Sequence, residues 1–181
     1  TATQTVVITD NEKPTISTTN VNVNNDAGKC GASVAIAQPT TADNCGVASV
    51  AGVRSDNELL TADYPVGTTT ITWTVRDVNG NSTTTTQTVV VNDTELPVVV
   101  TNNITIQLAA NGQASITTAQ INSGSSDNCG IATFTLSKSN FDCSNVGENT
   151  VVLTVTDIHG NSATANAIVT VQDNIAPTVI T

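Results

Sequence analysis

An internal repeat constrains the fold of this chain more than any other feature of its sequence. Three markers recur in the same order: Asp10-Asn-Glu-Lys-Pro returns as Asp93-Thr-Glu-Leu-Pro, Asp43-Asn-Cys-Gly as Asp127-Asn-Cys-Gly, and Asp77-Val-Asn-Gly-Asn as Asp157-Ile-His-Gly-Asn. The period is about 80 residues, the size of one small β-domain, so the chain of 181 residues is expected to hold tandem copies of one unit.

The two ends of the chain carry pieces of the same unit. The opening segment Thr3-Gln-Thr-Val-Val-Ile-Thr-Asp nearly copies Thr86-Gln-Thr-Val-Val-Val-Asn-Asp, and Asp173-Asn-Ile-Ala-Pro resembles the marker that opens each repeat. The expected organisation is therefore the last strand of a preceding repeat (1–10), two full repeats (11–92 and 93–172) and the start of a following repeat (173–181).

Period-two alternation predicts strands throughout each repeat. Ile71, Trp73 and Val75 alternate with threonines, and the same pattern returns around Leu153, which takes the place of Trp73. This replacement indicates that Trp73 fills the core, although an exposed ring that stacks on sugars is the alternative. Further strands are predicted at 21–24, 33–37, 47–53 and 82–91, and in the second repeat at 104–108, 114–118, 131–137 and 162–171. The fold class is all-β, with tandem β-sandwiches of immunoglobulin or fibronectin type III kind.

Composition narrows the function and the compartment. The chain has 5 Lys and Arg against 15 Asp and Glu, a net charge of −10, which argues against nucleic-acid binding and against docking on anionic lipid. It has no apolar run long enough to span a membrane. The four cysteines form no C-x-x-C pair of the kind that binds zinc, which favours disulfides and an extracellular location. The lone histidine, His159, is expected at the surface. No G-x-S-x-G motif and no Cys/His pair is present, so we predict that the chain is not an enzyme.

The Asp-x-x-x-Pro junction, the Asp-Asn-Cys-Gly loop and the Asp-x-x-Gly-Asn turn before a valine-rich strand together resemble the HYR (hyalin repeat) family. The spacing is similar to that of tandem Ig-like repeats in large surface adhesins of Bacteroidetes-type bacteria, including gliding-motility adhesins. The resemblance covers nearly the whole chain. It implies an Ig-like fold, exposure at the cell surface and a role in adhesion or display. Many such repeats carry four or more cysteines, whereas each repeat here has two.

Strand direction predicts that acidic side chains converge at one pole of each repeat. The junction, the loop after the second strand and the turn before the last strand all return to the end where the repeat begins. Oxygen ligands without His or Cys suit Ca²⁺, so we predict one ion for each junction, stiffening the linker. Its predicted ligands are Asp10, Glu12, Asp43 and Asp77 at the first junction and Asp93, Glu95, Asp127 and Asp157 at the second. The alternative is that these acids only cap turns and loops.

The cysteines are expected to pair within repeats, as Cys30–Cys45 and Cys129–Cys143. The same strand directions place Cys30 and Cys45 near opposite poles, although a disulfide needs Cα atoms within about 7 Å. Either the loop folds back along the sheet, or its acids lie further from the junction than predicted.

The predicted function is that of a repeat module of a large cell-surface adhesin, in a calcium-stiffened stalk. Its expected partners are the neighbouring repeats and a surface polysaccharide or another cell-surface ligand. Two other classes stay open: a non-adhesive spacer of a secreted protein, and a carbohydrate-binding module. A sugar-binding face requires exposed aromatic side chains, and the few aromatics of this chain do not recur between the repeats.

Overall fold

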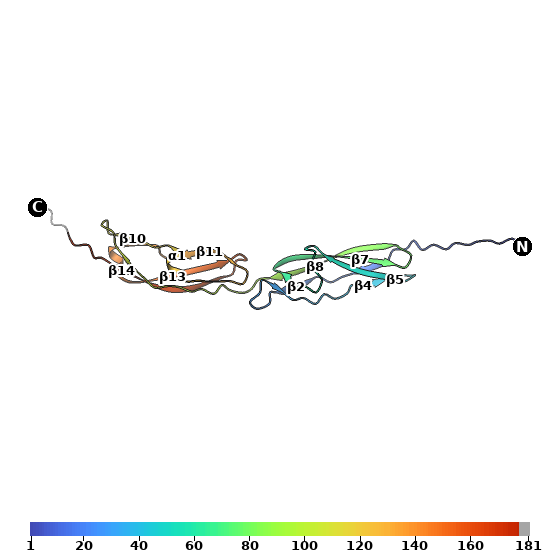
Figure 1. Ribbon diagram of the computed structural model, residues 1–181, viewed down its shortest axis with the longest axis horizontal. Helices are drawn as coiled ribbons and strands as arrows, with labels where there is room; N and C mark the ends of the chain where they lie inside the picture. The colour runs from blue at the N-terminus through green and yellow to red at the C-terminus, as the bar shows by residue number, and fades with distance from the viewer. Residues whose placement is uncertain (178–181) are drawn as a thin grey trace. The chain divides into compact units, whose positions relative to one another are not determined.

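The computed structural model describes residues 1–177 and contains two compact units, Thr1–Asp93 and Thr94–Thr181 (Figure 1). Each unit has a hydrophobic core of its own. Nearly all of the regular secondary structure in both units is β-strand, which confirms the predicted all-β, Ig-like fold class.

Unit 1 contains eight strands within its described residues. They are β1 (Thr15–Ser17), β2 (Val21–Asn24), β3 (Gly31–Ala32), β4 (Thr40–Ala42), β5 (Val47–Arg54), β6 (Tyr64–Pro65), β7 (Gly67–Asp77) and β8 (Ser82–Asn92). The main sheet has the order β2-β8-β7-β5, with β2 parallel to β8 and the other neighbours antiparallel. The short pairs β1–β4 and β3–β6 form the second layer, and side chains of both layers share one core.

Alternation along β7 places one face of the main sheet in that core. Ile71, Trp73 and Val75 are at most 1% exposed, which confirms Trp73 as a core residue and excludes the exposed sugar-stacking role. The indole N–H of Trp73 donates to Gln87 Oε1 over 2.9 Å, so the buried donor is satisfied.

Unit 2 repeats this plan with a different second layer. Its elements are β9 (Ile104–Gln107), β10 (Gln113–Ser115), α1 (Thr118–Ile121), β11 (Ile131–Leu136), β12 (Asn140–Asp142), the 3₁₀ turn η1 (Cys143–Asn145), β13 (Gly147–Asp157) and β14 (Ser162–Gln172). The main sheet is β11-β13-β14-β9, again with one parallel pair, β14–β9. The one-turn helix α1 and the pair β10–β12 take the place of the short strands of unit 1.

The long strands of both sheets lie where the alternation predicts them, but two second-layer predictions are wrong. No strand forms at the predicted position 33–37: β3 ends at Ala32, and the Ser33 N–H donates to the Asp26 carboxylate instead of to a neighbouring strand. The strand predicted at 114–118 ends at Ser115, because Thr117 caps α1. Both segments carry alternating apolar residues that pack on the core, although their backbones do not form the continuous hydrogen bonds of a full strand.

Residues 1–14 form no strand, and Val6, Val7 and Ile8 are 74%, 78% and 92% exposed. The predicted start of a following repeat, 173–181, lies partly outside the described residues. No helix within residues 1–177 has the length and apolar character that crossing a bilayer requires.

Candidate metal centre

The turn between β7 and β8 is organised by a buried carboxylate. Asp77 ends β7, is 2% exposed and accepts the backbone N–H groups of Asn79 and Asn81 at Oδ1, over 2.9 and 2.8 Å. Its Oδ2 accepts the Asn81 side-chain amide over 2.7 Å. A carboxylate that ends a strand and accepts the next two free amides is the usual chemistry of an Asp-x-x-Gly turn.

The Asp-Asn-Cys-Gly loop lies against that turn. Asp43 Oδ1 accepts the N–H groups of Cys45 and Gly46, both over 2.9 Å, and Gly46 has a φ of +110° that other residues rarely adopt. The Gly46 carbonyl then accepts the N–H of Val78 over 3.1 Å. This bond fastens the loop to the β7–β8 turn and brings Asp43 beside Asp77.

The segment before β1 supplies the third acid. Asp10 Oδ2 accepts the Asn79 side-chain amide over 2.9 Å, and the Asp10 carbonyl accepts that of Asn81 over 3.2 Å. The hydrogen bond from Asn79, aided by the Glu12 N–H, holds the pKa of Asp10 below its ordinary value. A further hydrogen bond, between the Cys45 thiol and Asp10, raises the pKa of that thiol.

Asp10, Asp43 and Asp77 can therefore each place a carboxylate oxygen within 4.8 Å of the other two. The Asp43 Oδ2 atom is buried and accepts no hydrogen bond. Buried acceptors are normally satisfied, so an unpartnered carboxylate oxygen beside two more carboxylates marks a place where a cation fits.

Unit 2 builds the same arrangement from Asp127 and Asp157. Asp127 Oδ1 accepts the N–H groups of Cys129 and Gly130 over 2.8 and 3.0 Å, and its buried Oδ2 again has no hydrogen-bond partner. Asp157 is 2% exposed and accepts the N–H groups of His159 and Asn161 over 2.8 and 2.9 Å. The Asp-Asn-Cys-Gly loop thus leaves the same aspartate oxygen without a hydrogen-bond partner in both units.

The remaining predicted ligands are Glu12, Asp93 and Glu95. Glu12 is exposed and is not a member of the three-acid group of unit 1. Asp93 directly follows β8 at the end of unit 1, and Glu95 stands near the start of unit 2; both are half-buried.

The predicted disulfides within repeats are wrong. Cys45 and Cys143, one member of each predicted pair, are free thiols. In unit 1, Cys30 lies beside Val66, at the end of β8, and Cys45 lies beside the turn that begins β8. A strand of 11 residues is roughly 33 Å long, far beyond the reach of a disulfide. Cys30 and Cys45 therefore lie near opposite poles of unit 1, as the strand directions predict, and are too far apart to pair.

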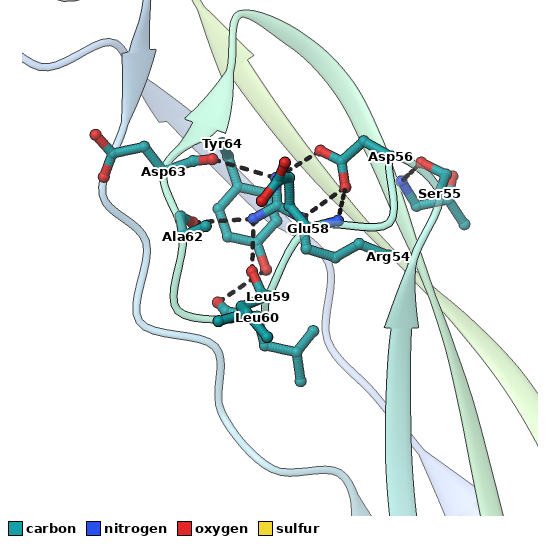
Figure 2. A network of polar contacts seen from close by, with 10 residues as sticks. Arg54, Ser55, Asp56, Glu58, Leu59, Leu60, Ala62, Asp63 and Tyr64 are labelled. Carbon is teal, nitrogen blue, oxygen red and sulfur yellow. Dashed lines mark hydrogen bonds and ion pairs between the residues drawn. The ribbon is translucent and has the colours of Figure 1, made fainter.

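One polar network was not anticipated from the sequence. Arg54, at the end of β5, is 2% exposed and holds the loop 55–63 in place (Figure 2). Its guanidinium donates to both oxygens of Asp56, over 2.9 and 2.6 Å, and stacks 3.8 Å from the ring centroid of Tyr64. It also donates to the carbonyls of Leu59, Ala62 and Asp63. The Arg-x-Asp spacing was the available signal, but it is too common to identify a buried arginine.

The acid sites give unit 2 a predictable response to low pH. Burial of Asp157 works to raise its pKa, but hydrogen bonds from Asn161, His159 and Gly160 outweigh burial and hold the pKa below the ordinary value. A lowered folded-state pKa contributes stability that is complete above the unfolded-state pKa, near 4, and is lost as the pH falls through the folded-state pKa.

We therefore expect the unfolding free energy of unit 2 to decrease as the pH is lowered beneath about 4, by at most ~1.4 kcal/mol per pH unit for this one group. Urea titrations followed by circular dichroism in EDTA, from pH 6 to pH 2, measure it. In Asp157→Asn the stability at pH 6 should be lower and the slope of unit 2 shallower. An unchanged slope would contradict the assignment.

Part of this chain matches a known family of extracellular repeats, and most of it is similar to one known protein. Residues 9–91 match the family model described as the HYR domain. Hyalin of Lytechinus variegatus is 33% identical over 160 residues, which cover 85% of this chain and 30% of that protein. The chain thus spans less than a third of the curated relative that it matches.

Solved structures with a similar arrangement of strands share little sequence with the chain. Drosophila N-cadherin EC1-4 is 11% identical, with a TM-score of 0.44, over 89% of this chain and 50% of that one. Human mucin-like protocadherin EC1-2 is also 11% identical with a TM-score of 0.44, over 88% and 98%.

Proposed function

We propose that this chain is a stretch of HYR-type repeats from a large extracellular adhesin, in which Ca²⁺ binds at each junction and stiffens the stalk. The HYR match and the similarity to hyalin support an adhesion-type repeat module at the cell surface or outside the cell. The observation that carries the calcium proposal is the buried, unpartnered Oδ2 of Asp43 beside Asp10 and Asp77.

The donor set favours a hard divalent ion. Three carboxylates within 4.8 Å repel one another unless they are protonated or bridged, and Asp10 has a lowered pKa, so it is ionised near neutral pH. Calcium takes 6 to 8 oxygens in flexible geometry, which leaves room for amide oxygens and water beside the carboxylates.

A purely structural role explains only part of this arrangement. Hydrogen bonds to Asp77 and to Asp43 Oδ1 account for the turn and for the loop without any ion. They do not account for Asp43 Oδ2, nor for Asp127 Oδ2, its counterpart in unit 2. Asp93 has the position of Asp10 in the sequence repeat, so it would complete the second site with Asp127 and Asp157. Asp173 has the same position again and would belong to a third site.

The carbohydrate-binding alternative lacks the surface that it needs. Of the four aromatic side chains, Trp73, Tyr64 and Phe141 are at most 3% exposed, so none of these three rings can stack on a sugar. The fourth, Phe134, is half-buried and packs against the core of unit 2. A spacer without an adhesive surface of its own would have the same junctions. Adhesin and spacer are separated by the binding of the purified chain to surface polysaccharides: saturable binding supports the adhesin, and its absence supports the spacer.

Calcium binding is tested by the melting of the full chain. In millimolar Ca²⁺ we expect the Tm to exceed that in EDTA by roughly 5 °C, since an ion at ten times its Kd adds about 1.4 kcal/mol to a domain of this size. Scanning calorimetry gives the shift, and the fluorescence of Trp73, the single tryptophan, reports unit 1 alone.

The variant Asp43→Asn/Asp127→Asn separates binding from capping. An asparagine Oδ1 can still accept the two loop N–H groups, while its amide replaces the unpartnered oxygen. We expect this variant to be at least as stable as the wild type in EDTA, because carboxylate repulsion is relieved, and to lose the calcium response.

The charge-matched control is Glu58→Gln/Glu148→Gln, which removes two exposed acids away from both loops and should keep the full shift. A wild type without any shift, or a shift that survives in Asp43→Asn/Asp127→Asn, would refute calcium binding at these loops.

A further inference from the structure

The first strand of the main sheet runs parallel to the last strand in both units. In unit 1, β2 pairs with β8 over four residues of each strand, and in unit 2, β9 pairs with β14 over four residues. All other neighbours in the two main sheets are antiparallel. The chain therefore enters each unit ahead of one strand of the parallel pair and leaves after the other strand. Each parallel pair, with the hydrogen bonds described next, is here called the clamp of its unit.

One asparagine extends each clamp ahead of the parallel ladder. Asn20 Oδ1 accepts the N–H of Thr88 over 2.9 Å, and Asn103 Oδ1 accepts the N–H of Ile168 over 2.8 Å. Each asparagine stands directly before the first parallel strand and ten residues after the aspartate that opens its repeat. The bond therefore recurs at the same place in both units.

A threonine two residues earlier adds a second side-chain bond in each unit. Thr18 Oγ1 donates to the carbonyl of Thr86 over 3.2 Å, and Thr101 Oγ1 donates to the carbonyl of Asn166 over 2.7 Å. At the other end of each clamp, the backbone N–H that follows β2 or β9 donates to the carbonyl of the last residue of β8 or β14, over 2.8 and 2.9 Å. The bonds to the last strand thus extend over residues 18–25 in unit 1 and 101–108 in unit 2.

We propose that the clamp is the element of each unit that resists tension between its two ends. The inference rests on the proposed stalk, because a tethered stalk is pulled along its length. Since β2 and β8 are parallel, the start of β2 and the end of β8, where the pull arrives, lie at opposite ends of the clamp. The pull then runs along the strands, and the hydrogen bonds that cross it must break together. Two strands pulled from one shared end would instead separate one bond at a time.

The opposite side of each main sheet provides a matched control. Ser55 Oγ accepts the N–H of Thr70 over 3.2 Å, and Ser137 Oγ accepts the N–H of Val152 over 2.9 Å. In both cases an exposed side-chain oxygen accepts an N–H of a long strand, as it does in the clamp. These serines follow β5 and β11, which are joined to neither end of the unit, so their bonds lie outside the path of the pull.

The test is single-molecule stretching of the full chain between handles at its two ends, under constant force. Each unit of about 80 residues should lengthen the chain by roughly 25 nm when it unfolds, so the two events can be counted. A reducing buffer prevents cross-links between cysteines that would shorten these steps. The buffer also contains EDTA, so a failure of the calcium proposal would leave the result unchanged.

At one fixed force, Asn20→Ala/Asn103→Ala should unfold about three- to tenfold faster than the wild type, since each unit loses one hydrogen bond that carries load. Ser55→Ala/Ser137→Ala should stay within about twofold of the wild-type rate. Urea titration measures the loss of stability of each variant without force, and the rates under force are compared relative to that loss. Equal acceleration in the two variants, or a wild-type rate in Asn20→Ala/Asn103→Ala, would overturn the proposal. A wild type that lengthens gradually from the lowest forces, without two separate steps, would overturn it as well.

Discussion

Replacing Arg54 with methionine is expected to lower the unfolding free energy of unit 1 by about 3 kcal/mol, a large part of the stability of so small a domain. Methionine keeps much of the apolar volume but supplies no donor. The Arg54 side chain has no exposed surface in its bridge to Asp56, and it donates to three loop carbonyls. Acceptors left without a partner cost about 1–3 kcal/mol each where water cannot reach them.

Acceptors that regain water after the arginine is removed cost less, so the expected loss of unfolding free energy lies near the lower end of the sum for these acceptors. Asp56 is 31% exposed in the same bridge, so it regains water when the arginine is removed. The loop 55–63 should then open, and its amides should exchange hydrogen faster while β7 and β8 stay protected. Hydrogen-exchange mass spectrometry measures both effects, and urea titration by Trp73 fluorescence measures the loss of stability.

Lys138 provides the matched control in unit 2. It stands where Arg54 stands in unit 1, near the end of the corresponding segment, and lies 5.1 Å from the centroid of Phe141. This longer contact, on a half-buried side chain, is worth about 0.5–1 kcal/mol. Lys138→Met should therefore cost less than 1 kcal/mol in unit 2, by the same principle. Equal losses in the two variants would show that the carbonyl network contributes nothing beyond the cation–π contact.

The contrast between Arg54 and the loop acids shows what the sequence could predict. Asp43 and Asp77 recur as Asp127 and Asp157, and strand direction alone placed each pair at one pole, where the structure has them. Each position of the unit occurs twice in the sequence, so a residue that the fold requires can be recognised because it recurs in both copies. Arg54 has Lys138 as its counterpart, and no recurrence marked the guanidinium as buried.

The cysteines were misread because pairing depends on distance and not on grouping along the chain. Two cysteines in each repeat suggested two internal bridges, although Cys30 and Cys45 lie at opposite ends of an 11-residue strand. The cysteine outside the Asp-Asn-Cys-Gly loop stands at position 30 in unit 1 and at position 143 in unit 2, and this difference concealed that the two positions are equivalent in the fold. Only the register of β10 with β12 reveals it, and no property of the sequence predicts that register.

The two cores fill the same space with different pairs of side chains. Gly52 on β5 pairs with Trp73 on β7, and a Cβ at Gly52 would come within 2.8 Å of the indole ring. In unit 2, Leu136 on β11 pairs with Leu153 on β13 at the corresponding place. One very small and one very large residue are thus exchanged for two of intermediate size, which conserves the packed volume.

This exchange predicts a strong coupling between positions 52 and 73. Trp73→Leu removes half of a fully buried ring system and deprives the buried Gln87 of its indole donor, at a cost of about 3 kcal/mol. Gly52→Leu drives a side chain into the indole and should cost at least about 1–3 kcal/mol. In Gly52→Leu/Trp73→Leu the new leucines fill the same space, so the double variant should be more stable than the sum of the single losses predicts, by about 2 kcal/mol.

Calorimetry of the four proteins measures this coupling, with the unchanged unit 2 as the internal reference. Because the double variant has no tryptophan, circular dichroism replaces fluorescence for unit 1. Strictly additive losses would mean that Leu136 and Leu153 are accommodated by their own surroundings and not by each other. A favourable coupling would mean that this β-sandwich tolerates a change at one core position when its cross-strand neighbour compensates. The repeats could then diverge in sequence while the strands that position Asp43 and Asp77, or Asp127 and Asp157, keep their geometry.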